Sequence, residues 1–352
     1  MSTNRCAFGA LILALAVKGA PGQLSPSALW ATTAPSSFQA HSDLTYLTVN
    51  GHESKLDIYR RRGKGVSEPT LMYFHGGGWA SGNKEDGMMY TLAWLEMGWN
   101  VVNVDYRLVG VAGAPGAVED CLCALRWLVG HAAEYRIDPA RIVVMGDSAG
   151  GHLALMTGMA PAGAGLDRPC NPSGDAPIPK VAGIVNWFGI TDVSDLLEGP
   201  NKRDSVVEWL AKAANREDIA RRVSPVTWAR SDLPPIITIH GDSDPSVPYS
   251  QAIRLRDALT AAHARNELIT IIGSGVISND PTTRLSAANT EALPRKNVCA
   301  PTSRFGDFLR VPDCLPPSNR NRQRGNKLQP PPALLVSCRA WPTRNTSRSW
   351  RK

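Results

Sequence analysis

Short apolar runs and longer amphipathic stretches alternate along the chain between about residues 41 and 272. Residues 70–74, 100–104 and 141–145 have the length and the mainly apolar composition of buried strands. Residues 117–132 carry apolar side chains at every third or fourth position, which predicts a helix with a wide apolar face. Further strands are predicted over residues 44–49, 55–59, 181–187, 235–240 and 268–272.

This alternation predicts an α/β fold. Residues 44–49 and 55–59 differ from the rest, because Asn50-Gly51 between them favours a tight antiparallel hairpin. The later strands alternate with helical segments, which is the pattern of a mostly parallel central sheet with helices on both faces. In such sheets ligands bind beyond the carboxyl ends of the strands, so we expect the chemistry there.

The composition is that of a globular protein. Of the 352 residues, 43% are hydrophobic and 20% are charged, which allows a full core and excludes wholesale disorder. No apolar run reaches the roughly 18 residues of a spanning helix, so we expect no stable membrane insertion. The 7 Cys are too few for a disulfide scaffold. We expect Cys121 and Cys123 to pack as small apolar groups, whereas Cys170 could pair with another Cys.

The first 40 residues are interpreted as a leader and a linker. Arg5 precedes an apolar stretch over residues 6–17 that is followed by small residues. This pattern resembles a secretory signal peptide over residues 1–22. Residues 23–40 are rich in Ser, Pro, Ala and Thr and are interpreted as a linker. We therefore expect a secreted or periplasmic protein.

The positive charge is concentrated at the carboxyl end. Residues 273–352 hold 11 Arg and 3 Lys against 4 Asp and Glu, a formal charge of +10, so residues 1–272 carry −3 of the net +7. These last residues also hold 10 of the 27 Pro and show no sustained apolar period. We interpret them as a disordered or out-of-frame tail. The alternative is a basic arm for nucleic acid, but no groove-reading motif is present, so we expect no nucleic-acid partner.

The sharpest chemical signal is the sequence Gly-Asp-Ser-Ala-Gly at residues 146–150, directly after the strand 141–145. It is a G-x-S-x-G nucleophile elbow in its strand–turn–helix context. The glycines let the chain turn sharply, which leaves the hydroxyl of Ser148 exposed above the sheet. We predict that Ser148 is a nucleophile; the alternative is an ordinary Gly-rich loop.

A second motif, His-Gly-Gly-Gly-Trp at residues 75–79, follows the strand 70–74. A glycine run lets backbone N–H groups approach a substrate oxygen, and such donors stabilise the oxyanion that serine attack on an ester produces. The motif therefore predicts an oxyanion hole. A flexible loop, or a phosphate cradle without a lysine, is the alternative. His75 is expected to be a structural residue of the loop rather than a base.

A third motif, His-Gly-Asp-Ser-Asp-Pro-Ser-Val-Pro at residues 240–248, follows the strand 235–240. The acid of a catalytic triad belongs on a loop past a late strand, where it orients the catalytic His. Asp242 and Asp244 both satisfy this condition, and either could instead be a turn Asp that bonds its own backbone. We favour Asp244 as the acid.

In this order the three motifs resemble the α/β-hydrolase superfamily, and more narrowly its hormone-sensitive-lipase-like and bacterial feruloyl–acetylxylan-esterase-like families. The match is carried by H-G-G-G-W-A-S-G-N-K, V-D-Y-R-L, M-G-D-S-A-G-G-H-L-A and H-G-D-S-D-P-S-V-P-Y-S-Q. The resemblance implies an α/β-hydrolase domain over residues 41–272 with a small cap insertion at about 191–232. It also implies a serine carboxylesterase that acts on short acyl or polysaccharide-linked esters, with no cofactor and no metal.

The resemblance assigns roles residue by residue. Ser148 matches the nucleophile, and Asp244 matches the acid of a D-x-x-V-P pattern. The N–H groups of Gly77, Gly78 and Ala149 match the oxyanion hole. The supporting residues, and the Trp residues that line the pocket or pack in the core, are His75, Gly76, Asp242, Trp79, Trp187 and Trp209.

The chain departs from this pattern in its last element. The triad needs a His on the loop past the last strand, but the seven His stop at His263, which precedes the strand 268–272. His240 beside the acid is a poorly placed substitute, and His152, one helical turn past the nucleophile, is expected to face away from the site. No catalytic His is therefore identified. Because the motif is lost where the composition turns basic, we hypothesise a frameshift near Gly275 and expect low activity.

Other functions on the same fold stay open. H-G-G-x-W loops also resemble those of arylformamidase-like enzymes, and D-x-x-V-P also resembles prolyl-oligopeptidase-type peptidases. A chain that has lost its His could instead be a non-catalytic protein that keeps an acyl- or sugar-binding pocket.

Overall fold

The structure is a computed structural model that describes residues 32, 36–63, 67–213 and 215–275. All of these residues belong to the first of the chain's two units, Met1–Cys314, and the second unit, Leu315–Lys352, lies outside the described residues. The predicted signal peptide lies outside them too, as does the tail from residue 276 onwards.

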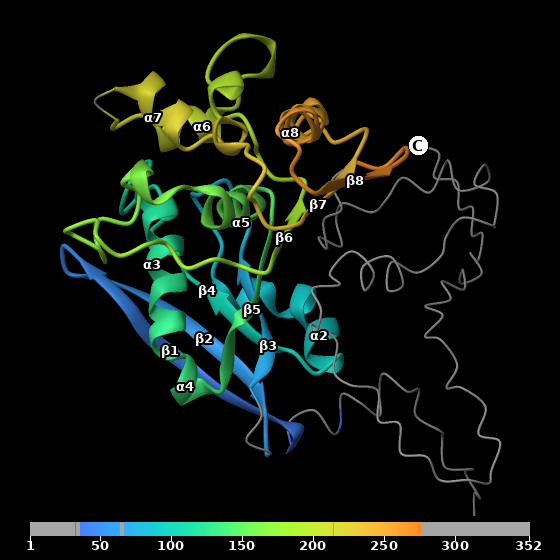
Figure 1. The fold of residues 1–352 in the computed structure, drawn as a ribbon. Coiled ribbons are helices and arrows are strands. Elements are labelled where there is room, and N and C mark those ends of the chain that lie inside the picture. The colour runs from blue at the N-terminus through green and yellow to red at the C-terminus, as the bar shows by residue number, and fades with distance from the viewer. Residues whose placement is uncertain (1–31, 33–35, 64–66, 214, 276–352) are drawn as a thin grey trace, which may run out of the picture. The chain divides into compact units, whose positions relative to one another are not determined.

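Eight strands form one sheet in the described part of the chain, in the order β1-β2-β4-β3-β5-β6-β7-β8 (Figure 1). The β1–β2 and β2–β4 pairs are antiparallel, and the pairs from β4–β3 to β7–β8 are parallel. The strands are β1 (Phe38–Val49), β2 (His52–Arg61), β3 (Glu68–Phe74), β4 (Asn100–Val104), β5 (Ile137–Asp147), β6 (Gly183–Trp187), β7 (Ile236–Gly241) and β8 (Asn266–Ile271). The predicted α/β-hydrolase fold, with a mostly parallel central sheet, is confirmed.

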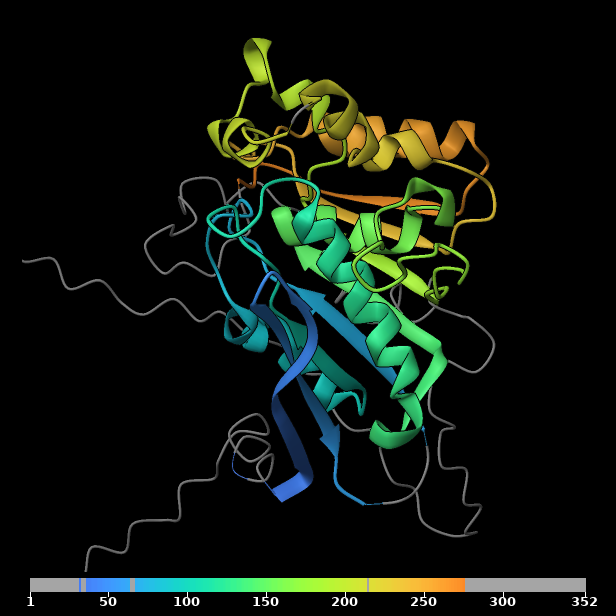
Figure 2. The ribbon, with the colours of Figure 1, turned by 90° about the vertical axis from the view of Figure 1, so that its left-hand side faces the viewer.

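Helices cover both faces of this sheet. Apolar side chains of α3, α5 and α8 join the strands in one core, and those of α2 join them in a second core. Figures 1 and 2 show α3 and α2 on opposite sides of the sheet. The helices are α2 (Met88–Glu96), α3 (Gly116–Gly130), α4 (Ala132–Tyr135), α5 (Ala149–Met159), α6 (Asp204–Trp209), α7 (Arg216–Arg222) and α8 (Ser250–Ala261).

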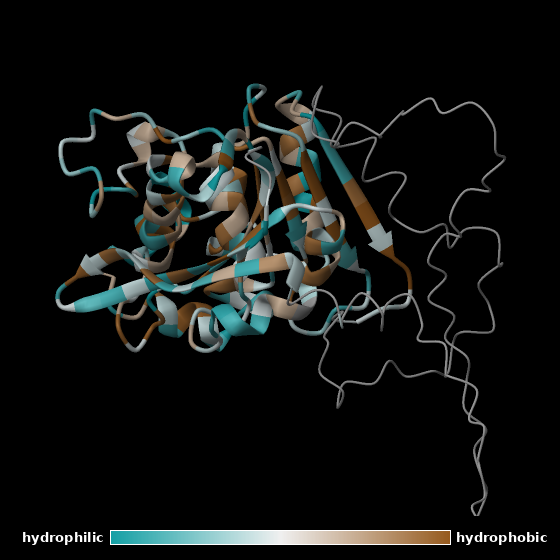
Figure 3. Ribbon diagram, turned by 90° about the horizontal axis from the view of Figure 1, so that it is seen from below, coloured by the Kyte–Doolittle hydropathy of each residue, from teal (hydrophilic) through white to brown (hydrophobic). Residues whose placement is uncertain are grey.

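The central strands are buried because helices lie on both of their faces. Every residue of β4 and β7 is buried. The β1–β2 hairpin mixes polar and apolar residues. Figure 3, which colours the residues by hydropathy, shows teal and brown segments interspersed on the ribbon. The hairpin turns at Asn50-Gly51 as predicted, with φ of 50° and 79°. Because β1 begins at Phe38, the predicted linker ends before residue 40.

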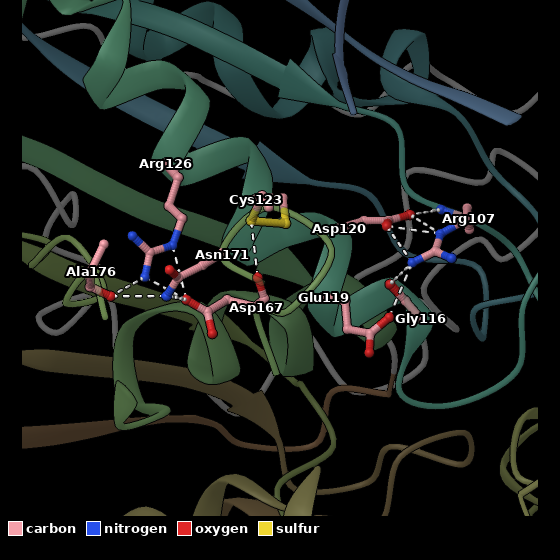
Figure 4. Close-up of a disulfide and its surroundings, with 10 residues drawn as sticks. Arg107, Gly116, Glu119, Asp120, Cys123, Arg126, Asp167, Asn171 and Ala176 are labelled. Carbon is pink, nitrogen blue, oxygen red and sulfur yellow. Dashed lines mark hydrogen bonds and ion pairs between the residues drawn. A yellow bond between two sulfur atoms is a disulfide. The ribbon is translucent and has the colours of Figure 1, made fainter. Parts of the chain in front are cut away.

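A disulfide joins Cys123 of α3 to Cys170, which lies 47 residues further along the chain (Figure 4). The expectation that Cys123 packs as a free apolar group was therefore wrong, because the fold brings a second Cys to the same face of α3. Cys121 is buried and free, as expected. Arg126 of α3 reinforces the same junction, since its Nε donates to Asp167 Oδ2 at 2.9 Å.

The start of α3 also holds a buried ion pair. Arg107, from the V-D-Y-R-L stretch, donates through Nε to Asp120 Oδ1 at 2.8 Å, and the side chain of Asp120 has no exposed surface (Figure 4). The loop after β4 is therefore anchored on α3.

Residues 191–232 lie within the segment between β6 and β7 and contain α6 and α7 (Figure 1). The resemblance assigned this segment to the cap. Across the described residues, no helix is long and apolar enough to cross a membrane.

Candidate active site

Ser148 occupies a sharp turn between β5 and α5. Its backbone has φ 53° and ψ −118°, and its N–H donates to Trp187 O at 2.9 Å. The turn needs a glycine two residues later, because a Cβ on Gly150 would stand 2.0 Å from Phe74 O of β3. The sequence motif therefore folds as the predicted strand–turn–helix elbow.

Ser148 is half-buried, and no described residue forms a hydrogen bond with its Oγ. Ala149 is the first residue of α5, so its N–H has no carbonyl partner within the helix. The amino end of α5 adds the partial positive charge of a helix terminus. The elbow thus combines an N–H donor at a helix start with a hydroxyl that has no hydrogen-bond partner among the described residues.

The loop after β3 lies directly against this elbow. Gly77 has φ 111°, and a Cβ there would stand 2.2 Å from Ser81 O, so only glycine allows this tight turn. The carbonyl of Gly77 accepts the N–H groups of Ala80 and Ser81 at 3.0 and 3.1 Å. A Cβ on Gly76 would stand 2.5 Å from Asp147 Oδ2, which places the loop beside the residue that precedes Ser148.

Asp147 joins the two loops. Tyr73 Oη donates to Asp147 Oδ1 at 2.5 Å. Burial raises the pKa of Asp147, and hydrogen bonds from Tyr73 and from the N–H of Gly76 oppose that rise. One carboxyl group therefore bonds a side chain of β3 and the backbone of the glycine loop.

His75 packs against the same glycine loop through its ring and its backbone. Its ring stacks on Tyr106 at 4.3 Å, and Tyr106 Oη donates to His75 O at 2.8 Å. Nδ1 of His75 lies 2.8 Å from Gly76 O, and burial lowers the pKa of the imidazole. This geometry suits a neutral structural residue rather than a base.

Two of the three Trp residues singled out from the sequence pack in the core. Trp79 and Trp209 have no exposed surface, and their rings stack at 4.3 Å. The indole N–H of Trp79 donates to His152 Nδ1 at 3.3 Å, and Nε2 of His152 lies 2.7 Å from Val223 O. Burial lowers the pKa of His152 to about 4, so this His is neutral and already bonded at both nitrogens. Trp187, at the end of β6, keeps some exposed surface.

The loop after β7 holds Asp244 in a buried position. Asp244 Oδ1 accepts the N–H groups of Ser246 and Val247 at 2.8 and 2.9 Å. Asp244 Oδ2 is also buried, and it has no hydrogen-bond partner among the described residues. A carboxylate oxygen left open in this way is suited to receive an N–H donor.

Asp242 is used differently. It is exposed, and its Oδ1 accepts the N–H of Gly273 at 2.8 Å. A Cβ on Gly241 would stand 2.3 Å from Ser274 O, so the turn after β8 lies against the loop that carries Asp244. The first three residues of the predicted tail, 273–275, therefore belong to the folded domain.

The turn after β8, where the base of a triad is expected, carries none of the seven His. His240 is fully buried, and its Nε2 donates to Val247 O at 3.0 Å, so it is not an available substitute base. His263 is exposed just past the end of α8. The remaining His residues are on β1, β2 and the end of α3, namely His41, His52 and His131. In the described part of the chain, no three His, Cys, Asp or Glu side chains gather as metal ligands would.

A comparison with protein families places this architecture. The family model described as BD-FAE matches residues 56–259, which is more than half of the chain. This chain belongs to the BD-FAE family. The match runs from β2 to α8 and includes the glycine loop, Ser148 and Asp244.

Curated relatives extend the likeness. The chain is 30% identical over 217 residues to the probable carboxylic ester hydrolase LipM of Mycobacterium tuberculosis, which covers 59% of this chain and 49% of LipM. It is 28% identical over 240 residues to the esterase LipQ of the same organism, with 64% and 55% covered. The chain thus spans about half the length of the curated relatives it matches.

Solved structures of esterases are similar to this chain as well. Esterase 2 of the Planctomycetes species Thermogutta terrifontis, with butyrate bound, is 28% identical with a TM-score of 0.57, and the likeness covers 67% of this chain and 84% of that one. The same enzyme phosphorylated by paraoxon is 26% identical with a TM-score of 0.56, covering 68% and 84%.

Proposed function

We propose that this member of the BD-FAE family is a serine carboxylesterase that hydrolyses short acyl or carbohydrate-linked esters. The observation that carries the proposal is the strained turn at Ser148, packed against the glycine loop after β3. Relatives named carboxylic ester hydrolase and esterase, and a similar structure with bound butyrate, support the same chemistry.

In the proposed reaction, Ser148 Oγ attacks the ester carbonyl carbon and gives its proton to a water molecule. The carbonyl oxygen becomes an oxyanion, which the N–H groups of Gly77, Gly78 and Ala149 stabilise. The tetrahedral intermediate then breaks its bond to the alcohol oxygen, which takes up a proton from water, and an acyl group is left on Ser148. Water attacks this acyl-enzyme, releases the carboxylic acid and restores the hydroxyl.

Asp244 is the proposed acid of the site. Two backbone N–H donors fix Oδ1 of its carboxylate. Oδ2 has no hydrogen-bond partner among the described residues, so it can accept an N–H donor. In a serine hydrolase that donor is the imidazole that takes the serine proton. This chain has no His after His263, so the proton of Ser148 has no imidazole to accept it.

The missing base sets the expected rate. Loss of the triad His in a serine hydrolase lowers turnover on the order of 10⁶-fold, and the oxyanion hole and binding provide the remainder. We therefore expect slow ester hydrolysis from the chain as written.

The test uses the full chain with p-nitrophenyl acetate and butyrate, beside a Ser148→Ala variant. Without a base, the parent chain and the Ser148→Ala variant should hydrolyse the esters equally slowly, because the oxyanion hole and binding alone provide this rate. With imidazole added as the base that the chain lacks, we expect faster hydrolysis that the substitution abolishes, together with covalent labelling of Ser148 by paraoxon. If the Ser148→Ala variant hydrolysed both esters as fast as the parent chain in the presence of imidazole, the proposal would be refuted. A parallel panel of acetylated xylan, feruloyl esters, aryl formamides and aminoacyl amides separates an esterase from an arylformamidase- or peptidase-like hydrolase.

The absent base favours a second candidate function, a non-catalytic protein that binds an acyl or sugar ligand. A folded chain that binds butyrate or a xylo-oligosaccharide, but neither reacts with paraoxon nor hydrolyses any ester, would favour this function over the first.

We also propose that the protein is exported. The Cys123–Cys170 disulfide supports this, since such bonds persist in oxidising compartments. The signal-like pattern in residues 1–22 points the same way. Cell fractionation with thiol labelling tests the proposal: recovery only from a reducing compartment, with both thiols free, would contradict it.

A further inference from the structure

The turn that carries Asp244 is held by two side chains from outside it. Arg203 Nε donates to Ser246 O at 2.8 Å, and His240 Nε2 donates to Val247 O at 3.0 Å. The carbonyl of Ser246 and the N–H of Val247 belong to one peptide unit, and that N–H bonds Asp244 Oδ1. A rotation of this unit would break the bonds to Arg203 and to Asp244 together.

His240 holds the turn from the core side. Its ring has no exposed surface and meets Phe188 and Tyr249 edge-on, at 6.3 and 5.6 Å between centroids. Nε2 also lies 3.5 Å from Asp244 Oδ2, which is longer than its bond to Val247 O. Because packing fixes the ring, its N–H holds the carbonyl of Val247, the residue whose own N–H bonds Asp244 Oδ1.

Arg203 bonds the turn from the segment before α6. It precedes α6, and its Nη1 donates to Asn201 O and Lys202 O at 3.1 and 3.0 Å, which fixes the guanidinium within its own segment. The segment 201–209 also contacts the glycine loop. Ser205 Cβ lies 3.3 Å from the position that a Cβ on Gly78 would take, and Trp209 at its end stacks on Trp79.

We propose that Arg203 and His240 are positioning residues for Asp244. We further propose that Arg203 couples the position of segment 201–209 to the orientation of this carboxylate. The proposal rests on the proposed function, which makes Asp244 the acid of the site. Segment 201–209 contacts the acid turn through Arg203 and the glycine loop through Ser205 and Trp209. It therefore spans two of the three loops that build the site.

The test exploits a match of side-chain length. Gln places an N–H donor as many bonds from Cα as Arg Nε and His Nε2, whereas Met places a methyl group there. Arg203→Gln and His240→Gln should keep each bond, and Arg203→Met and His240→Met should remove it. Lys202→Met is the control, because it removes a neighbouring positive charge whose side chain has no bond to the acid turn.

Two readouts are measured on the full chain. Amide hydrogen exchange at Ser246 and Val247 reports how firmly these N–H groups are bonded to Asp244. We expect exchange faster by about twofold to tenfold in both Met variants, the factor that one net hydrogen bond is worth, and parent-like exchange in the Gln variants and the control. Hydrolysis of p-nitrophenyl acetate with added imidazole, which Asp244 can orient in place of the missing His, should show a lower kcat with an unchanged KM in the Met variants only.

The outcomes separate the two proposals. Parent-like exchange in the Met variants, or equal exchange in the Gln and Met variants, overturns the positioning role. Faster exchange with unchanged kcat overturns the link to Asp244 as an acid. If the parent chain hydrolyses no ester, the proposed function fails, and the exchange data alone decide whether the two side chains hold the turn.

Discussion

Replacement of Ser148 by Gly should stabilise the fold while it removes the proposed nucleophile. With φ 53° and ψ −118°, Ser148 adopts a conformation in which its Cβ crowds the backbone. Conformations of this kind cost about 1–3 kcal/mol, and Gly removes that cost. Gly also enlarges the freedom of the unfolded chain, which costs about 0.5–1 kcal/mol. The difference leaves Ser148→Gly more stable than Ser148→Ala by about 1 kcal/mol.

Ser148→Ala is the matched reference, because it loses the same hydroxyl but keeps the Cβ. Urea unfolding followed by circular dichroism gives the free energy of unfolding of both variants and of the parent chain. We expect equal slopes against urea and a higher midpoint for the Gly variant. A Gly variant no more stable than the Ala variant would show that the turn is unstrained. The argument that backbone strain presents Ser148 to a substrate would then fail.

Three further predictions concern stability. Replacing Cys123 and Cys170 together by Ala should lower the free energy of unfolding by up to about 4 kcal/mol in chemical denaturation, as expected for a loop of 47 residues, and an unchanged value would contradict a native bond. His152 has a folded pKa of about 4 against 6.5 unfolded, so the unfolded state binds more protons between these values. Stability should therefore fall by about 3 kcal/mol as the pH drops through this range, and His152→Gln should remove that slope. Arg107→Met should lower the free energy of unfolding by about 3–5 kcal/mol because it leaves Asp120 buried without its partner. A variant that melts at the same temperature as the parent chain would show that this ion pair contributes little to stability.

Local sequence patterns predicted the elements well because each rests on short-range physics. The Asn50-Gly51 hairpin follows from the preference of these residues for positive φ, and the elbow at Ser148 follows from the close approach that Gly150 permits. The buried strands follow from their apolar runs. Such features depend on a few neighbouring residues, so they can be read without knowing the fold.

Long-range contacts were beyond the same patterns. Cys123 looked like a packing residue because its partner Cys170 is 47 residues away. His240 was weighed as a substitute base because it is near Asp244 in the sequence, but its N–H is directed to Val247 O. Trp79 and Trp209 could have lined a pocket or the core, and their complete burial in the folded chain places them in the core.

The sequence by itself determined the class of fold through the order of its motifs, and it predicted the turn at Ser148. It also showed that no His follows residue 263. The tertiary structure alone decided which carboxylate is buried with an oxygen open to a donor, and which side chains hold it. The physical reason is that a turn fixes its own backbone through neighbouring residues. Asp244 accepts two N–H groups of its own turn. Its burial, and the bonds of that turn to Arg203 and to the buried ring of His240, form only when the chain folds.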